Sequence, residues 1–128
     1  GFSVIDYYRV NPELGDWQDI HLLSKSFKLM FDGVINHISA KSHWFQAYLK
    51  GDPDFKDYFI EIDKDDDVSR VFRPRALPLA TAFETVNGVK NIWTTFSEDQ
   101  TDLNFKSEDV FIETTTDGVR VRLFFLVL

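Results

Sequence analysis

The sequence predicts an α/β fold, and three observations along residues 16–37 support this prediction. An apolar helical face within residues 16–27 is followed at once by a short apolar run, residues 28–36. A helix next to a buried strand is the repeating unit of α/β proteins. The run ends in the polar pair Asn36-His37, and in barrels of alternating strands and helices ligand-binding residues lie at such strand ends. A buried strand that meets an ordinary polar loop would leave the same pattern.

The first helix is expected to follow a loop that covers residues 1–15. Asp16 is placed to cap this helix, and Asp19 lies in the first turn, where a carboxylate complements the helix dipole. The side chains of Trp17, Ile20 and Leu23 then share one apolar face.

A second helix is expected over Trp44–Lys50, with Ser42 as its cap and a stop at residues 51–53, Gly-Asp-Pro. Beyond this helix the chain changes character. Short extended pieces, Tyr58–Ile62 and Lys90–Phe96, alternate with polar loops. This pattern is typical of an irregular insertion between barrel elements.

The last part of the chain predicts a β-hairpin. Two β-prone runs, Val110–Glu113 and Val119–Val127, flank the turn sequence Thr116-Asp117-Gly118, and Asp-Gly between such runs is a strong hairpin signal. The chain therefore divides into residues 1–42 (helix and strand), 43–108 (insertion) and 109–128 (a further strand region or a hairpin). The alternative to a barrel segment is a compact α+β domain with a C-terminal hairpin.

Composition restricts the possible partners and compartments. The chain has 128 residues, enough for one domain, and its 14 basic and 21 acidic residues give a net charge of −7. Such a charge disfavours nucleic acid and anionic membranes as partners. Cysteine is absent, which excludes disulfides and fits a reducing, cytoplasmic location. No apolar run approaches the roughly 20 residues of a membrane span. No signal peptide is recognisable. The chain begins with Gly1 and not with an initiator Met, so it is expected to be processed, cut or incompletely observed.

No metal or cofactor is expected. Residues 63–67, Asp-Lys-Asp-Asp-Asp, resemble the start of a calcium loop, but Val68 stands where an EF-hand needs glycine. We therefore expect a solvated acidic loop. The histidines His21, His37 and His43 lack a metal-ligand spacing, and His21 is expected to be exposed on the first helix.

Two other clusters have two interpretations each. Arg73 and Arg75 flank Pro74, which stiffens the backbone and would present two guanidinium groups to a phosphate or carboxylate. Salt bridges to the acidic loop would explain them equally well. Trp93, Phe96 and Gln100 form an aromatic-polar cluster, which suits core packing or a platform for a sugar face.

Five motifs occur in order along the chain. They are Ile5-Asp6-Tyr7, Asn11-Pro12-Glu13-Leu14-Gly15-Asp16-Trp17, Asp32-x-x-x-Asn36-His37-x-Ser39, Phe72-Arg73-Pro74-Arg75 and Trp93-Thr94-Thr95-Phe96-Ser97-x-Asp99-Gln100-x-Asp102-Leu103-Asn104. Together they resemble the sucrose phosphorylase branch of glycoside hydrolase family 13, the α-amylase family. The resemblance covers roughly residues 1–113.

The resemblance implies a (β/α)8 barrel whose third strand is residues 28–36 and whose B-domain insertion is residues 43–108. It also implies an activity, the cleavage of an α-glucoside by phosphate with retention of configuration through a glucosyl-enzyme intermediate. Arg73 and Arg75 would lie on the acceptor and phosphate side.

Five residues would form part of the glucose subsite. Asp6 and His37 would hydrogen-bond the hydroxyls of the glucosyl ring, and Asn36 would brace their loop. Phe96 and Gln100 would line the site near the scissile bond.

The chain departs from the family pattern where the nucleophile is expected. The fourth barrel strand of the family carries Arg-x-Asp, whereas residues 118–124 read Gly-Val-Arg-Val-Arg-Leu-Phe and place Phe124 at the nucleophile position. A phenylalanine cannot form the covalent intermediate, and the other catalytic carboxyls belong to later strands. A barrel needs about 200 residues.

Three hypotheses stay open. The chain is part of a phosphorylase and has no catalytic residue of its own, or it is a non-catalytic α+β domain of phosphorylase origin, engineered or dimeric. The third hypothesis is a phosphate- or sugar-phosphate-binding module that uses Arg73 and Arg75. The apolar end, residues 123–128, must be buried in the fold, against a second copy or against the remainder of the barrel.

Overall fold

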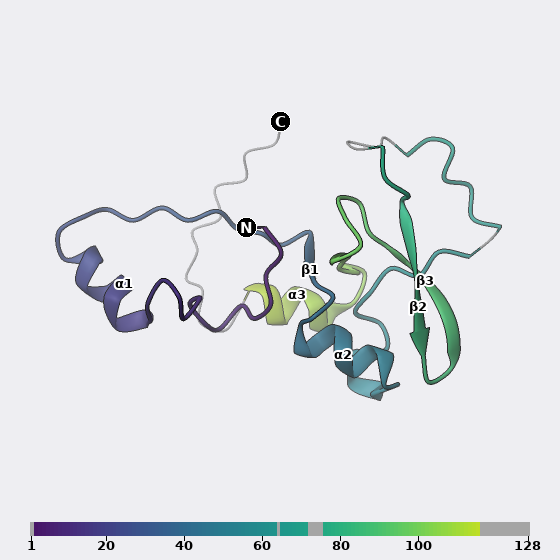
Figure 1. Cartoon of the computed structure of the whole chain (residues 1–128), viewed down its shortest axis with the longest axis horizontal. Coiled ribbons are helices and arrows are strands. Elements are labelled where there is room, and N and C mark those ends of the chain that lie inside the picture. The colour runs from purple at the N-terminus through teal and green to yellow at the C-terminus, as the bar shows by residue number, and fades with distance from the viewer. Residues whose placement is uncertain (1, 64, 72–75, 116–128) are drawn as a thin grey trace.

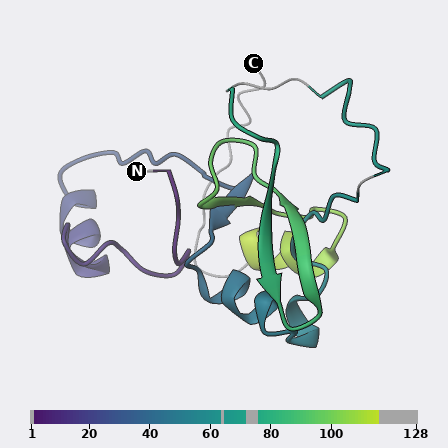
Figure 2. The ribbon, with the colours of Figure 1, turned by 45° about the vertical axis from the view of Figure 1, so that its right-hand side comes forward.

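Among the described residues, 2–63, 65–71 and 76–115, the computed structural model has three α-helices, a short 3-10 helix and two two-stranded antiparallel sheets. The helix α1 stands apart from the rest in both ribbon views, whereas α2, α3 and the strands gather together (Figures 1 and 2). No described helix is long and apolar enough to cross a membrane. The elements in chain order are α1 (Trp17–Ser24), β1 (His37–Ser39), α2 (His43–Leu49), η1 (Pro53–Phe55), β2 (Ala80–Thr85), β3 (Gly88–Trp93), β4 (Gln100–Asp102) and α3 (Glu108–Thr115).

The first helix forms where its cap predicts. The Asp16 side chain accepts hydrogen bonds from the backbone N–H groups of Gln18 and Asp19, and the Asp19 carboxylate accepts from the Asp16 N–H. This reciprocal pair is a capping box. None of the residues of α1 is buried, however, so the helix is held by local bonds more than by core packing.

The predicted strand over residues 28–36 is wrong for the described structure. This segment is neither helix nor strand, and Leu29, Met30 and Phe31 are exposed. A strand needs neighbours for its backbone groups, and one buried on both faces also needs cover on each side. Within the part of the chain that the structure describes, no strand pairs with this segment.

The first strand, β1, begins at His37. It pairs antiparallel with β4, and the register sets His37 opposite Asp102 and Ser39 opposite Gln100. His37 is thereby joined to Gln100, which lies 63 residues further along the chain. The predicted extended piece Tyr58–Ile62 links the two sheets through bridges to Leu103 and Ile92.

The second helix, α2, supplies the centre of the core. Ser42 caps it as predicted, because the Ser42 hydroxyl accepts from the Phe45 N–H at 3.2 Å. Beyond the helix, Gly51 adopts a positive φ of 75°, which favours glycine. The buried apolar cluster comprises Ile38, Phe45, Tyr48, Tyr58, Phe59, Ile92, Leu103 and Val110.

Two elements differ from the sequence prediction. The β2–β3 hairpin turns at Val86-Asn87, and only its second strand overlaps the predicted extended piece 90–96. The predicted strand Val110–Glu113 is wrong, because these residues lie inside α3. Glu108 and Asp109 occupy the first turn of that helix, where acidic groups complement its dipole. The predicted hairpin around Asp117-Gly118 lies outside the described residues.

Candidate functional site

An open cavity of about 410 Å³ lies where the chain enters β1 and β4. Its walls come from the N-terminal segment, from the stretch before β1 and from the stretch between β3 and β4. The lining residues are Phe2, Asp32, Gly33, Val34, Ile35, Asn36, His37, Phe96 and Gln100. Four of the predicted sugar-site residues (Asn36, His37, Phe96 and Gln100) are therefore brought together.

His37 is the buried polar residue of this cavity. Its Nε2 atom lies 2.9 Å from the Phe2 carbonyl oxygen and 2.9 Å from the Gln100 amide nitrogen. The carbonyl requires Nε2 to donate, whereas the amide requires it to accept, so a neutral ring satisfies one contact at a time. The other ring nitrogen, Nδ1, is buried without a hydrogen-bond partner among the described residues. His37 therefore retains hydrogen-bonding capacity that the described residues do not use.

Phe96 and Gln100 complete the polar and aromatic lining. The Phe96 ring lies 5.3 Å from the His37 ring, at an angle of 60°. The Gln100 side chain is fixed by the Ser97 hydroxyl, which donates to its Oε1 at 2.8 Å, and its amide also donates to the Phe2 carbonyl at 3.3 Å. An aromatic face beside an amide and an imidazole can contact a ring that carries hydroxyls.

Asn36 joins the cavity to a buried carboxylate. The Asn36 carbonyl accepts from the Leu103 N–H at 2.9 Å, and its side chain hydrogen-bonds the carboxylate of Asp102. Asp102 also accepts from the backbone N–H and the hydroxyl of Thr95. Burial raises the pKa of Asp102, and these hydrogen bonds only partly offset that effect. Sequence reasoning gave Asp102 no role, although Asp102 is part of the family motif that begins at Trp93.

A second carboxylate, Asp99, holds the N-terminal segment in place. It accepts from the hydroxyls of Ser3 and Ser39 at 2.5 and 3.0 Å. The Ser39 N–H donates to the Val4 carbonyl at 2.7 Å. These contacts hold the N-terminal segment, which contains Phe2, beside the cavity.

The remaining predicted site residues lie elsewhere. Asp6 is exposed and is not part of the cavity lining; its Oδ1 accepts from the Tyr8 N–H at 2.8 Å in a local turn. Arg73 and Arg75 lie outside the described residues, as does Phe124. The roles assigned to these residues stay predictions.

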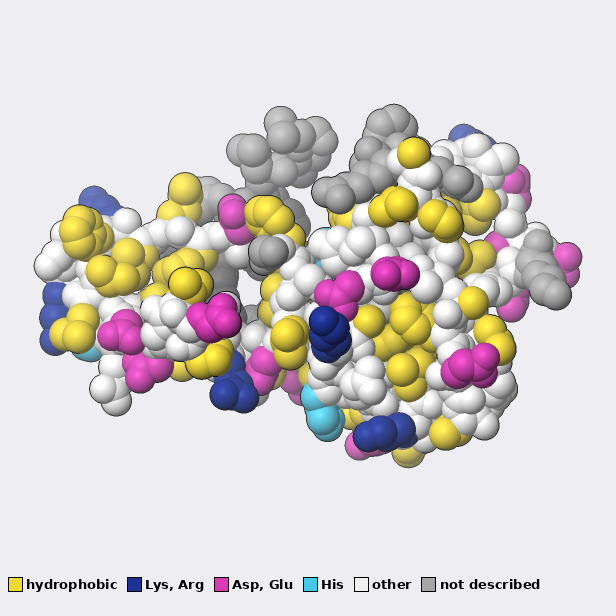
Figure 3. Space-filling view, viewed as in Figure 1, with side chains coloured by type: hydrophobic (Ala, Val, Ile, Leu, Met, Phe, Trp, Pro, Cys, Tyr) yellow, Lys and Arg dark blue, Asp and Glu magenta, His cyan; other side chains and the backbone are white. Residues whose placement is uncertain are grey.

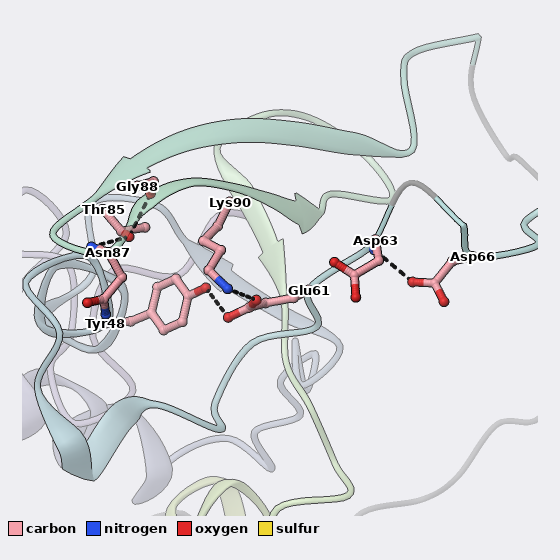
Figure 4. A network of polar contacts seen from close by, with 8 residues as sticks. All are labelled: Tyr48, Glu61, Asp63, Asp66, Thr85, Asn87, Gly88 and Lys90. Carbon is pink, nitrogen blue, oxygen red and sulfur yellow. Dashed lines mark hydrogen bonds and ion pairs between the residues drawn. The ribbon is translucent and has the colours of Figure 1, made fainter.

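A second cavity, of about 510 Å³, lies beside the acidic loop. Figure 4 shows the contacts at its edge, where Tyr48 and Lys90 each donate to Glu61 at 2.7 Å. The described aspartates of the loop are exposed, which agrees with the predicted solvated loop. The described residues include no group of three or more side chains that could hold a metal ion.

Comparison with known families and curated proteins gives a consistent match. Residues 1–122 match the family model for the α-amylase catalytic domain. The chain is 55% identical over 113 residues to a glucosylglycerate phosphorylase of Allomeiothermus silvanus, covering 88% of this chain and 20% of that protein. It is 34% identical over 131 residues to a sucrose phosphorylase of Streptococcus mutans, covering 94% of this chain and 26% of that protein.

A solved structure supports the same match. The crystal structure of sucrose 6F-phosphate phosphorylase from Thermoanaerobacter thermosaccharolyticum superimposes with a TM-score of 0.74 at 28% identity. The alignment covers 89% of this chain and 27% of that one. The chain thus spans about a fifth to a quarter of the length of the relatives that it matches.

Proposed function

Because the chain belongs to the α-amylase catalytic-domain family, we propose that it is one segment of a retaining α-glucoside phosphorylase. Such an enzyme cleaves an α-glucoside with inorganic phosphate and releases glucose 1-phosphate. The proposal is supported by the names of the relatives, which are glucosylglycerate and sucrose phosphorylases.

The glucoside is proposed to be glucosylglycerate. Three glucosylglycerate phosphorylases, including that of Escherichia coli K12, are 53–55% identical to this chain. The sucrose phosphorylases compared with it are 30–34% identical. The difference supports a glycerate acceptor more than a fructose acceptor. Arg73 and Arg75 are proposed to face the phosphate or the acceptor carboxylate, which guanidinium groups suit.

The observation that carries the proposal is the convergence of His37, Phe96 and Gln100 on one cavity. Its volume of about 410 Å³ lies in the range of small-molecule sites. A sugar hydroxyl both donates and accepts, so it suits the competing contacts of the His37 Nε2 atom. Asn36 would brace this wall, and Asp6 would reach the sugar only if the N-terminal loop is rearranged in the complete enzyme.

Catalysis is not proposed for this chain alone. Retaining cleavage needs two carboxyl groups about 5–5.5 Å apart, and Asp32 supplies the one carboxylate among the residues that line the cavity. Incubation of the purified chain with glucosylglycerate and phosphate is expected to yield no glucose 1-phosphate. Clear turnover would contradict the assignment of the chain as a segment without catalytic carboxyls.

Binding of glucose tests the cavity itself. Titration of the chain with glucose, followed by tryptophan fluorescence, is expected to saturate, and His37→Ala is expected to weaken binding about tenfold, since the Nε2 hydrogen bond to the sugar is lost. His21→Ala, an exposed histidine on α1, is the matched control and is expected to bind as the wild type does. Equal binding by both variants would count against a sugar site at His37.

A second candidate function is a non-catalytic α+β domain that associates with itself or with the remainder of a barrel. The observation in its favour is the exposed apolar surface over α1 and the segment that follows, visible at the left of Figure 3. A stable dimer in size-exclusion chromatography combined with no glucose binding would favour this function over the first.

A further inference from the structure

We propose that Asp102 is a positioning residue for the sugar cavity, because its carboxylate joins the two chain segments that carry His37 and Phe96. The inference rests on the proposed function, in which this cavity binds the glucosyl ring. Asp102 itself does not line the cavity. It would act through the residues that do.

The geometry places one carboxylate between two segments. Asp102 lies opposite His37 in the β1–β4 register and is 5% exposed. It accepts hydrogen bonds from the Asn36 side chain and from the Thr95 N–H and hydroxyl. Asn36 directly precedes His37 in the sequence, and Thr95 directly precedes Phe96. The two rings that follow lie 5.3 Å apart.

The Thr95 hydroxyl is itself oriented. Its oxygen accepts from the Trp93 indole N–H at 2.8 Å, and its proton is donated to Asp102. An indole nitrogen can only donate. The direction of this chain of hydrogen bonds is therefore fixed from Trp93 through Thr95 to Asp102, and the carboxylate must accept.

The choice of an ionisable group at this place has a chemical reason. A carboxylate only accepts, and its two oxygens can serve all three donors at once. An asparagine would offer one oxygen and turn its own amide hydrogens toward one of the donors. Burying the charge is costly, and the raised pKa of Asp102 reflects that cost. An aspartate at position 102 is therefore explained better by the positions in which it holds its hydrogen-bond donors than by a contribution to the free energy of unfolding.

The variant Asp102→Asn tests the proposal, with Asp57→Asn as the matched control at an exposed carboxylate. Three quantities are measured on the whole chain: the urea midpoint, the NMR signals of the His37 ring, and the glucose affinity. In Asp102→Asn we expect a folded protein whose His37 ring signals shift, because the ring moves relative to Phe96. Its glucose affinity is expected to fall about tenfold, the equivalent of one buried hydrogen bond. In Asp57→Asn all three quantities should match the wild type.

A second pair of variants covers the case in which Asp102→Asn fails to fold. Thr95→Ser keeps the hydroxyl and is expected to retain the wild-type His37 signals, whereas Thr95→Val lacks it and is expected to shift them. Unchanged His37 signals in a folded Asp102→Asn or in Thr95→Val would overturn the inference. If the wild type itself does not bind glucose, the proposed function fails, and the His37 ring signals still decide the role of Asp102.

Discussion

Carboxylates in this protein differ sharply in their surroundings, and Glu61 shows how a partly exposed one is stabilised. Burial alone would raise the pKa of Glu61, but the hydrogen bonds from Lys90 and Tyr48 outweigh burial and hold it below its usual value. The pair also ties β3 and α2 to the extended segment that contains Glu61. A carboxyl group of this kind stabilises the fold only while it is ionised.

The lowered pKa of Glu61 determines how its contribution to stability depends on pH. Because the pKa is lower in the folded than in the unfolded chain, the contribution of Glu61 is present above its ordinary value of about 4.5 and is lost as the pH falls through the folded value. In urea unfolding, the advantage of the wild type over Glu61→Gln should therefore shrink as the pH is lowered from 7 to 3. Tyr48→Phe, which keeps the ring and removes one donor, should show part of this effect. An advantage that grows toward low pH would contradict the account.

At the scale of the element, two glycines with positive φ can be compared directly. Gly51 follows α2 with φ 75°, and Gly88 is the first residue of β3, directly after the β2–β3 turn, with φ 97°. A Cβ added at Gly51 would lie 2.6 Å from the Val86 Cγ2 atom, whereas one added at Gly88 would have nothing within 4 Å. The first position is therefore restricted by both conformation and space, and the second by conformation alone.

The variants Gly51→Ala and Gly88→Ala separate these two costs. Both should lose about 1–2 kcal/mol for the left-handed backbone, and Gly51→Ala should lose more because Val86 must move. Thermal unfolding measures the difference. Adding Val86→Ala to Gly51→Ala should recover part of the extra loss in a double-mutant cycle. Equal losses for the two glycine variants would exclude the contact with Val86 as a cause.

Short sequence patterns predicted the helices α1 and α2 correctly. They did not predict which distant segments pair as strands. The caps Asp16 and Ser42 predicted α1 and α2, because a capping bond joins residues two or three positions apart. The segment 28–36 has the composition of a strand, but strands depend on partners that a local pattern does not contain. The run at residues 110–113 is β-prone, yet the first turn of α3 and the burial of Val110 favour a helix.

The candidate site was predicted only in part, because some of its contacts depend on long-range strand pairing. The family motifs pointed to Asn36, His37, Phe96 and Gln100, and the structure gathers all four around one cavity. Asp6 stands apart, because its carboxylate accepts from the Tyr8 N–H in a local turn and does not line the cavity. The role of Asp102 depends on the β1–β4 register, which no single segment of the sequence specifies.

The whole molecule combines a packed core with an apolar surface that the described residues leave uncovered. Phe27, Met30 and Phe31 are 64, 96 and 59% exposed. Contiguous apolar exposure of this kind marks an interaction site. The chain spans about a fifth of the length of its glucosylglycerate phosphorylase relatives. Association with a further barrel segment, or with a second copy, stays a prediction that this surface supports.

The central claim is that the His37 cavity is part of a glucose subsite, and it is tested most directly by amide chemical-shift mapping during a glucose titration. The chain offers an internal comparison, since its second cavity, beside Glu61 and Lys90, is of similar size. The account predicts saturable shifts concentrated in residues 33–37 and 96–100. Shifts centred on the second cavity, or none at glucose concentrations that saturate weak sugar sites, would contradict it.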